Sequence, residues 1–264
     1  MRALDFWRTC LTIAGITQAD AFELVFFRFG LAKTSLFENP ATPVPDAVCN
    51  DIIRRLRSGE PSAYVAGKVN FAGVVVRVSP AVLIPRPETE ELVLQLIATR
   101  KLNGKAVLDL CTGSGCLALA LAKAFPKAAV KGSDISEEAL ALARCSARDN
   151  GLTRVEFTYG DFLASEKDQY DLVVSNPPYV PEGTPTFTAY EPALAVFSGS
   201  DGLDSYRRIL GSLARVLKSG GLAVFEIEPG KEKELALIAA TNGFAAPVFK
   251  KDLAGKIRFM WLTR

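Results

Sequence analysis

The stretch Val107-Leu108-Asp109-Leu110-Cys111-Thr112-Gly113-Ser114-Gly115 decides the fold. Its apolar run ends in a carboxylate and a glycine-rich turn, a pattern typical of a buried strand that passes directly into a helix. The glycines permit a tight turn and let a ligand approach the backbone N–H groups at the start of the helix. We therefore predict a strand at 105–110, a ligand-binding loop and a helix at 115–125.

Strand and helix patterns alternate from this stretch to the end of the chain. Further strands are predicted at 128–134, 154–159, 170–175, 221–227, 246–250 and 257–262, and further helices at 136–149, 203–218 and 230–242. Such alternation indicates an α/β fold with a mostly parallel sheet and helices on both faces. The last two strands are separated only by a short link at Ala254-Gly255, so we expect an antiparallel hairpin at one edge of the sheet.

The N-terminal part of the chain has a different pattern. Apolar side chains recur at helical spacing within residues 1–66, which predicts a small helical bundle. Residues 68–79 change to the period of a β-hairpin with a turn at Ala72-Gly73. We predict a helical domain at 1–67, a hairpin linker at 68–82 and an α/β domain at 83–264.

The composition excludes several classes of protein. The 264 residues are 49% hydrophobic and 23% charged, an ordinary globular balance, and the net charge of +2 speaks against a protein that grips long nucleic acid by its phosphates. There is no apolar run long enough for a membrane span and no signal-peptide pattern, so we expect a cytoplasmic protein. Histidine is absent, which excludes mechanisms based on histidine, and the five cysteines contain no CxxC pair. We therefore expect reduced thiols and no metal site.

The predicted loop Cys111, Thr112, Gly113, Ser114 and Gly115 has the features of a cofactor site. The spacing from Gly113 to Ala118 also fits a dinucleotide fingerprint, so a nicotinamide-dependent dehydrogenase is one alternative. Asp109 speaks against the dinucleotide, because a carboxylate four residues before Gly113 suits a ligand amine better than a pyrophosphate. This favours S-adenosylmethionine, whose amino acid end carries a cation.

Polar residues also follow the next strands of the predicted sheet. Asp134 ends the second strand, where an acid can bind both ribose hydroxyls or cap the following helix. Asp161 and Phe162 follow the third strand, where an acid can accept from an adenine amino group and an aromatic ring can cover the base, although Gly-Asp is also ordinary turn chemistry. Ligands of open α/β sheets bind beyond the carboxyl ends of the strands, so we expect these residues to converge with Asn176, which also borders the cofactor site.

The run Asn176-Pro177-Pro178-Tyr179 ends the fourth strand, and we call it the Asn-Pro-Pro-Tyr corner. Proline cannot donate to a sheet, and each proline holds the residue before it in extended geometry. The Asn176 carboxamide and the Pro177 backbone carbonyl are therefore expected to form a stiff pair of acceptors. Such a pair fits an –NH2 group that is held for a reaction.

Several motifs together resemble one known family. They are Gly59-Glu60-Pro61, Phe71, Leu83-Ile84-Pro85-Arg86-Pro87-Glu88-Thr89-Glu90, the Asn-Pro-Pro-Tyr corner, Tyr190-Glu191-Pro192 and Asp252-Leu253-Ala254-Gly255. This combination is similar to the HemK/PrmC family of release factor glutamine methyltransferases, from about Gly59 to the C-terminus. Cys111 departs from the family pattern, which commonly has glycine there, and its side chain is expected to narrow the cofactor loop slightly.

The resemblance implies a fold, a substrate and roles for residues. It implies a seven-stranded, Rossmann-like class I methyltransferase domain at 83–264 and substrate docking by the helical domain at 1–67. It implies that the target is the glutamine of the Gly-Gly-Gln tip of class I peptide chain release factors. Asn176 and Pro177 are then expected to hold the glutamine –NH2 and aim its lone pair at the methyl group, with Pro178 and Tyr179 against the amide.

Other interpretations of the same residues stay open. A nucleic-acid methyltransferase acting on exocyclic amines shares the corner, but it needs base extrusion and a basic channel. A scaffold that binds a cofactor without catalysis is a third interpretation. The segment 181–202 is expected to be a lid over the substrate or a disordered insertion. The sequence leaves open whether Arg86, Glu88, Glu90 and Glu226 border the active site.

Overall fold

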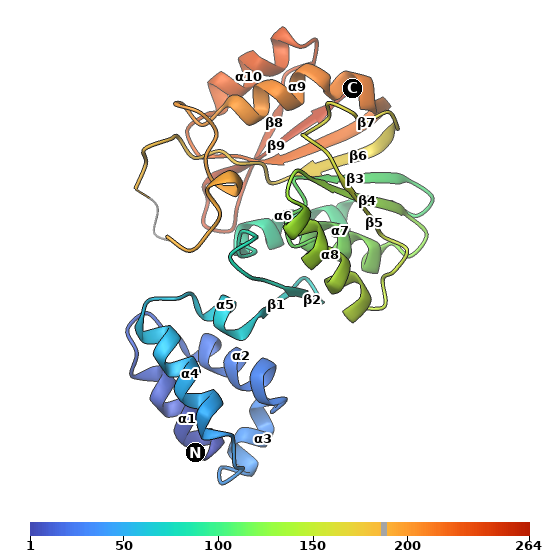
Figure 1. The fold of residues 1–264 in the computed structure, drawn as a ribbon. Helices are drawn as coiled ribbons and strands as arrows, with labels where there is room; N and C mark the ends of the chain where they lie inside the picture. The colour runs from blue at the N-terminus through green and yellow to red at the C-terminus, as the bar shows by residue number, and fades with distance from the viewer. Residues whose placement is uncertain (186–188) are drawn as a thin grey trace. The chain divides into compact units, whose positions relative to one another are not determined.

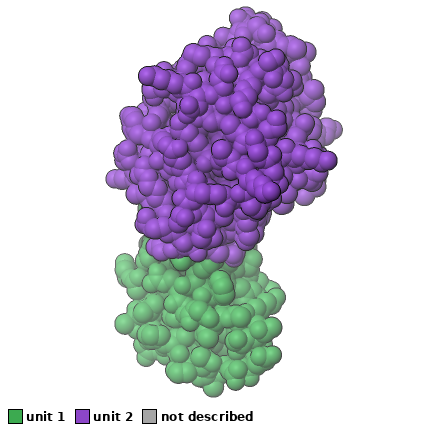
Figure 2. Space-filling view, turned by 90° about the vertical axis from the view of Figure 1, so that its right-hand side faces the viewer, with its two compact units in different colours: residues 1–69, 78–80 green, residues 70–77, 81–264 purple. Residues whose placement is uncertain are grey.

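The computed structural model describes residues 1–185 and 189–264, which form two compact units (Figure 2). The first unit contains residues 1–69 and 78–80, and the second contains residues 70–77 and 81–264. All five cysteines are free thiols. Among the described residues, none of the helices is long and apolar enough to cross a membrane.

The first unit is helical, as its apolar spacing predicts, and it contains five helices. They are α1 (Ala3–Leu11), α2 (Gln18–Phe29), α3 (Lys33–Glu38), α4 (Asp46–Arg57) and α5 (Ser62–Ala66). Thr17 and Asp20 form a capping box at the start of α2, and Gly30 ends that helix with a φ of 70°. Phe6, Leu24 and Ile52 are fully buried in the core of this unit.

A β-hairpin follows the helices. Its strands are β1 (Lys68–Phe71) and β2 (Val74–Arg77), and both residues of its turn have positive φ, 44° at Ala72 and 82° at Gly73. The Glu90 carboxylate accepts a hydrogen bond of 2.6 Å from the Ala72 backbone N–H. Glu90 therefore holds the hairpin turn.

The second unit contains the predicted sheet of seven strands. The strands are β3 (Ala106–Leu110), β4 (Ala129–Asp134), β5 (Glu156–Tyr159), β6 (Tyr170–Ser175), β7 (Leu217–Glu226), β8 (Val248–Lys251) and β9 (Ile257–Thr263). Their order is β5-β4-β3-β6-β7-β9-β8; β9 pairs antiparallel with β7 and with β8, and the other pairs are parallel. The predicted α/β fold, with its antiparallel hairpin at one edge, is confirmed.

One strand begins earlier than the sequence pattern indicates. The prediction for β7 begins at residue 221, but the strand begins at Leu217, which pairs with Tyr170 before the register shifts to Leu172 and Leu222. The pair Gly220-Gly221 resembles a turn in the sequence, and Gly220 has a φ of 71°. In the structure these glycines accommodate an irregularity within a continuous strand.

Helices cover both faces of this sheet. Figure 1 shows α9 (Asp204–Val216) and α10 (Glu232–Thr241) on one side, and α6 (Pro87–Thr99), α7 (Cys116–Ala124) and α8 (Glu137–Asp149) on the other. A short 3-10 helix, η1 (Ala193–Ala195), lies in the segment between β6 and α9. Buried apolar residues of β3, β6, β7 and β9 pack with α9 and α10, so a rigid core supports the carboxyl ends of the central strands.

Candidate functional site

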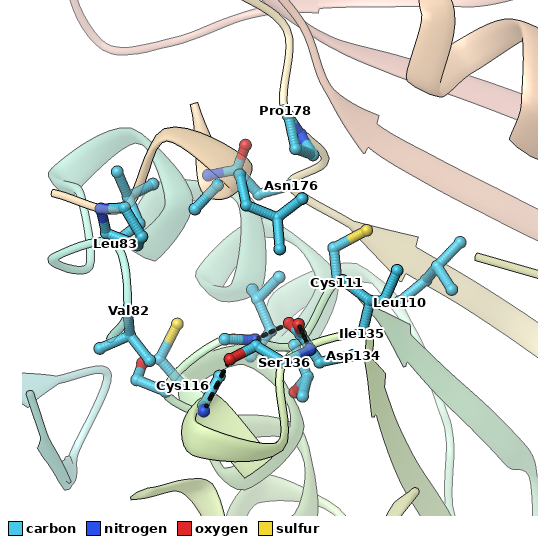
Figure 3. Close-up of a pocket in the computed structure, with 18 of the residues that line it drawn as sticks. Val82, Leu83, Leu110, Cys111, Cys116, Asp134, Ile135, Ser136, Asn176 and Pro178 are labelled. Atoms are coloured by element: carbon cyan, nitrogen blue, oxygen red, sulfur yellow. Dashed lines mark hydrogen bonds between the residues drawn. The ribbon is translucent and has the colours of Figure 1, made fainter. Parts of the chain in front are cut away.

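A cavity lies at the carboxyl ends of the central strands (Figure 3). Its wall contains these residues that the sequence singled out as site residues: Cys111, Thr112, Gly113, Ser114, Asp134, Asp161, Phe162, Asn176 and Pro178. Asp109, Gly115, Pro177 and Tyr179 are not part of the wall. The cavity thus brings together residues from the ends of β3, β4, β5 and β6, as expected for a parallel sheet.

The loop after β3 is held in an unusual backbone conformation. Cys111, Gly113 and Gly115 all have positive φ, at 59°, 53° and 83°. A Cβ atom on Gly115 would lie 3.0 Å from the Ala143 Cβ atom and 3.1 Å from the Phe157 ring, so glycine allows α7 to start against its neighbours. The backbone of the loop is also held by its own hydrogen bonds, since the N–H groups of Thr112, Gly113 and Gly115 donate to Ser133, Asp134 and Thr112. The loop therefore depends on its backbone shape, and Cys111 to Ser114 line the cavity.

Asp109 lies beneath this loop. Its Oδ2 atom accepts hydrogen bonds from the Thr112 hydroxyl at 2.5 Å and from the Ala118 backbone N–H at 3.0 Å. Among the residues that the structure describes, Asp109 Oδ1 is one of the few buried side-chain atoms with no hydrogen-bond partner. Burial raises the pKa of Asp109 to about 7. A buried carboxyl with one unused oxygen would be stabilised by a cation bound nearby.

Asp134 forms the end of β4 and faces the cavity. Its two oxygens accept from the Gly113 backbone N–H at 2.8 Å and the Ser136 backbone N–H at 2.9 Å. Burial raises the pKa of Asp134, and these backbone donors act against the rise. Each oxygen keeps further acceptor capacity, so this fixed carboxylate can bind a pair of neighbouring hydroxyl groups. Figure 3 shows Asp134 and Ser136 on the same part of the wall.

Asp161 and Phe162 form another part of the wall together with an arginine from α9. The Arg208 guanidinium donates to Asp161 Oδ2 at 2.5 Å, and its carbon lies 4.6 Å from the centre of the Phe162 ring. Phe162 has a φ of 49°, which is rare for a bulky residue. Within the described residues, three non-glycine residues have positive φ, and two of them, Cys111 and Phe162, line this cavity. Backbone strain of this kind clusters at functional sites.

Asn176 is part of a chain of hydrogen bonds. Its side-chain nitrogen donates to the Thr89 hydroxyl oxygen at 3.0 Å, and the Thr89 hydroxyl donates to Glu226 Oε2 at 2.6 Å. The Tyr179 hydroxyl donates to Glu226 Oε1 at 3.1 Å. Glu226 is therefore a buried carboxylate that is connected to both ends of the Asn-Pro-Pro-Tyr corner.

The segment 181–202 contributes to the wall of the cavity through Pro192, Leu194 and Ala195. Its two ends are joined, because the Val180 N–H donates to the Val196 carbonyl and the Ser198 N–H donates to the Val180 carbonyl, both at 2.9 Å. The middle of the predicted lid, 186–188, lies outside the described residues.

Two contacts attach this segment to the stretch before α6. Glu191 accepts from Arg86 at 2.5 Å and from the Ile84 N–H at 3.0 Å. Arg86 therefore borders the site, whereas Glu90 binds the hairpin turn, and Glu88 is not part of the cavity wall.

Replacing Cys111 tests the backbone strain in the cofactor loop. We expect the Cys111→Gly variant to be more stable than the Cys111→Ala variant by about 1 kcal/mol, since both lack the thiol but only alanine keeps a Cβ atom at positive φ. The difference in free energy of unfolding is measured by urea denaturation. An alanine variant as stable as the glycine variant would show that the loop relaxes without strain.

Sequence reasoning missed several residues of this site. Thr89 lies between two glutamates in the stretch that was singled out, but no local pattern distinguishes a threonine that binds a distant asparagine. Arg208 lies on an amphipathic helix among other arginines, and Leu194 lies in a segment without periodicity. Only the three-dimensional arrangement brings these residues to the cavity.

The chain is similar in sequence to known methyltransferases. Residues 88–195 match the family model described as methyltransferase small domain. A release factor glutamine methyltransferase of Thermodesulfovibrio yellowstonii is 35% identical over 275 residues, covering 100% of this chain and 99% of the relative. One of the same name from Deinococcus radiodurans is 37% identical over 264 residues, covering 96% and 94%.

Solved structures share the fold. A methyltransferase from Pyrococcus furiosus aligns with a TM-score of 0.55 and 20% identity over 72% of this chain and 89% of its own. A ribosomal protein L11 methylase from Lactobacillus delbrueckii aligns with a TM-score of 0.51 and 21% identity, over 67% of this chain and 77% of the methylase. At these identities the likeness establishes the class I methyltransferase fold.

Proposed function

This chain belongs to the family of release factor glutamine methyltransferases, and from that premise we propose that it methylates the side-chain amide nitrogen of a glutamine in peptide chain release factors. The observation that carries the proposal is that Asn176 and the cofactor loop line one cavity. We further propose that the target is the glutamine of the Gly-Gly-Gln motif in class I release factors, and that the protein acts in the cytoplasm, where translation takes place.

The residues of the cavity fit S-adenosylmethionine. Asp134, with both oxygens fixed by backbone N–H groups, would hold the ribose hydroxyls. Asp161 and Phe162 would hold the adenine, and the loop 111–115 would hold the amino acid end. The unused Asp109 Oδ1 beneath this loop is consistent with a cationic ligand above it. When bound, S-adenosylmethionine supplies a methyl group that is already activated on a sulfonium.

The Asn-Pro-Pro-Tyr corner would hold the substrate. An amide nitrogen is a poor nucleophile because its lone pair is delocalised into the carbonyl group. The Asn176 side-chain oxygen and the Pro177 backbone carbonyl would accept from the two N–H bonds and so fix the direction of the lone pair. They would also stabilise the positive charge that develops on the nitrogen. Orientation is then the main catalytic contribution, and it needs no histidine base.

Mass spectrometry of a release factor tests this proposal. After incubation with this protein and S-adenosylmethionine, the peptide that contains the Gly-Gly-Gln motif is expected to gain one methyl group on the glutamine. A release factor with Gln→Ala at that position is the matched control and is expected to remain unmodified. Transfer of the methyl group to RNA or DNA instead would favour the nucleic-acid methyltransferase, and an unmodified glutamine in the intact factor would contradict the proposal.

A further inference from the structure

The Asn176 carboxamide has two possible orientations that differ by exchange of its oxygen and nitrogen. One orientation presents the Asn176 oxygen, an acceptor, to a substrate –NH2 group. The other presents the Asn176 –NH2, and two donors that face each other cannot form a hydrogen bond. Catalysis at the Asn-Pro-Pro-Tyr corner therefore needs a group that selects the orientation. The group that selects the orientation must therefore always accept a hydrogen bond from Asn176 and never donate one to it.

Thr89 on α6 has this property. Its hydroxyl has one hydrogen, and that hydrogen lies on the 2.6 Å bond to Glu226 Oε2. The Thr89 oxygen can then only accept, so the group that lies 3.0 Å from it must be the Asn176 –NH2. Exchange of the amide would place the Asn176 oxygen against the lone pairs of Thr89. Thr89 is 3% exposed, so water does not readily replace either contact.

Glu226 at the end of β7 keeps Thr89 in this role. Glu226 accepts from Thr89 through one oxygen and from Tyr179 through the other, so both carboxylate oxygens act as acceptors. Burial raises the pKa of Glu226, and these two hydrogen bonds act against the rise by stabilising the charged form. Its exposed fraction is 1%, and its backbone carbonyl accepts from the buried Tyr206 hydroxyl at 2.6 Å. The carboxylate is thus held where it binds Tyr179 directly and Asn176 through Thr89, the two ends of the Asn-Pro-Pro-Tyr corner.

We infer that Thr89 and Glu226 are positioning residues, which orient the Asn176 carboxamide so that its oxygen faces the glutamine –NH2 of the substrate. This inference rests on the proposed function, because the substrate amide is what the oriented oxygen binds. Neither residue contacts the reacting atoms. They act through Asn176, and Tyr179 is held by the same carboxylate.

Two substitutions of Thr89 distinguish the effect of its hydroxyl group from the effect of its side-chain volume. Thr89→Val keeps the shape but removes the acceptor, so we expect kcat to fall about 100-fold while the Kd for S-adenosylmethionine stays near that of the wild type. Thr89→Ser keeps the hydroxyl and is expected to restore most of kcat. Thr99→Val, at the exposed end of the same helix, is the matched control and is expected to have the wild-type kcat.

A second measurement does not depend on methyl transfer. The side-chain N–H signals of Asn176 in 15N-labelled protein, assigned by their absence in Asn176→Asp, are expected to show slowed hydrogen exchange that is lost in Thr89→Val and kept in Thr89→Ser. If the wild type fails to methylate release factors but shows this pattern, the proposed function fails and the positioning role holds.

Three outcomes would overturn the inference. They are a Thr89→Val enzyme with wild-type kcat, a Thr89→Ser enzyme as slow as Thr89→Val, and Asn176 signals that exchange equally in both variants. Thermal unfolding of each variant identifies loss of the fold. If Thr89→Val unfolds, Glu226→Gln replaces it, since an amide cannot accept from both hydroxyls through its two different atoms. A lowered kcat then supports the inference, and an unchanged kcat contradicts it.

Discussion

Replacing Asn176 with alanine is expected to lower kcat for glutamine methylation about 100- to 1000-fold, the loss typical of one oriented hydrogen-bonding group in a transition state. The expected loss lies in kcat because, in the proposed mechanism, the side-chain oxygen acts on the substrate nitrogen as charge develops there. The Kd for S-adenosylmethionine is expected to change much less, since Asp134, Asp161 and the loop 111–115 stay intact. Single-turnover kinetics and calorimetric titration measure the two quantities.

The matched control for this variant is Asn103→Ala. Asn103 is exposed, lies in the same unit and accepts from the Lys127 backbone N–H at 3.0 Å, away from the cavity. It is expected to keep the wild-type kcat. An Asn176→Ala enzyme that methylates the release factor as fast as this control would remove Asn176 from the mechanism.

Among the variants proposed here, Gly202→Ala is expected to lower the free energy of unfolding the most. Gly202 has a φ of 79°, and a Cβ atom there would lie 2.3 Å from the Tyr179 backbone carbonyl oxygen. The positive φ costs about 1 to 2 kcal/mol for a non-glycine residue, and the clash adds about 1 to 3 kcal/mol. Because the clash is with backbone, the Asn-Pro-Pro-Tyr corner must move, and kcat is expected to fall about 100-fold.

Gly183 provides the control within the same segment. It has a φ of 81°, but a Cβ atom there would meet no atom of the described residues within 4 Å. The free energy of unfolding of the Gly183→Ala variant is therefore expected to fall by about 1 to 2 kcal/mol, which is the cost of positive φ alone. Urea denaturation compares the two free energies of unfolding. Equal losses in both variants would show that the corner tolerates displacement at Tyr179.

The fold could be predicted from the sequence because its signals are local. Each buried strand of the parallel sheet is a short apolar run, and each helix shows its own period, so their alternation indicates the architecture. The convergence of Asp134, Asp161 and Asn176 also follows, because neighbouring parallel strands end at the same edge of a sheet. The early start of β7 could not be predicted, since Gly220-Gly221 has the local pattern of a turn.

The remaining details of the site are not local. Thr89 contacts Asn176 across 87 residues of sequence and Glu226 across 137. Arg208 reaches Asp161 across 47 residues. Nothing in the sequence around each partner indicates these pairs, because they depend on how helices pack on the sheet. The positive φ of Cys111 and Phe162 is likewise a property of the folded loops, although the resemblance to a family with glycine at Cys111 points to it.

The hydrogen bonds from Asn176 through Thr89 to Glu226 also have a consequence for the order of folding. Contacts that span 87 and 137 residues close long loops, and such contacts form late. During synthesis the cofactor loop and its strands β3 to β5 can assemble before β7 has left the ribosome. A nascent chain can therefore acquire its cofactor-binding elements while the carboxamide of Asn176 is still free to rotate. With the positioning role that we infer for Glu226, methyl transfer can start only when β7 adds this carboxylate to the sheet.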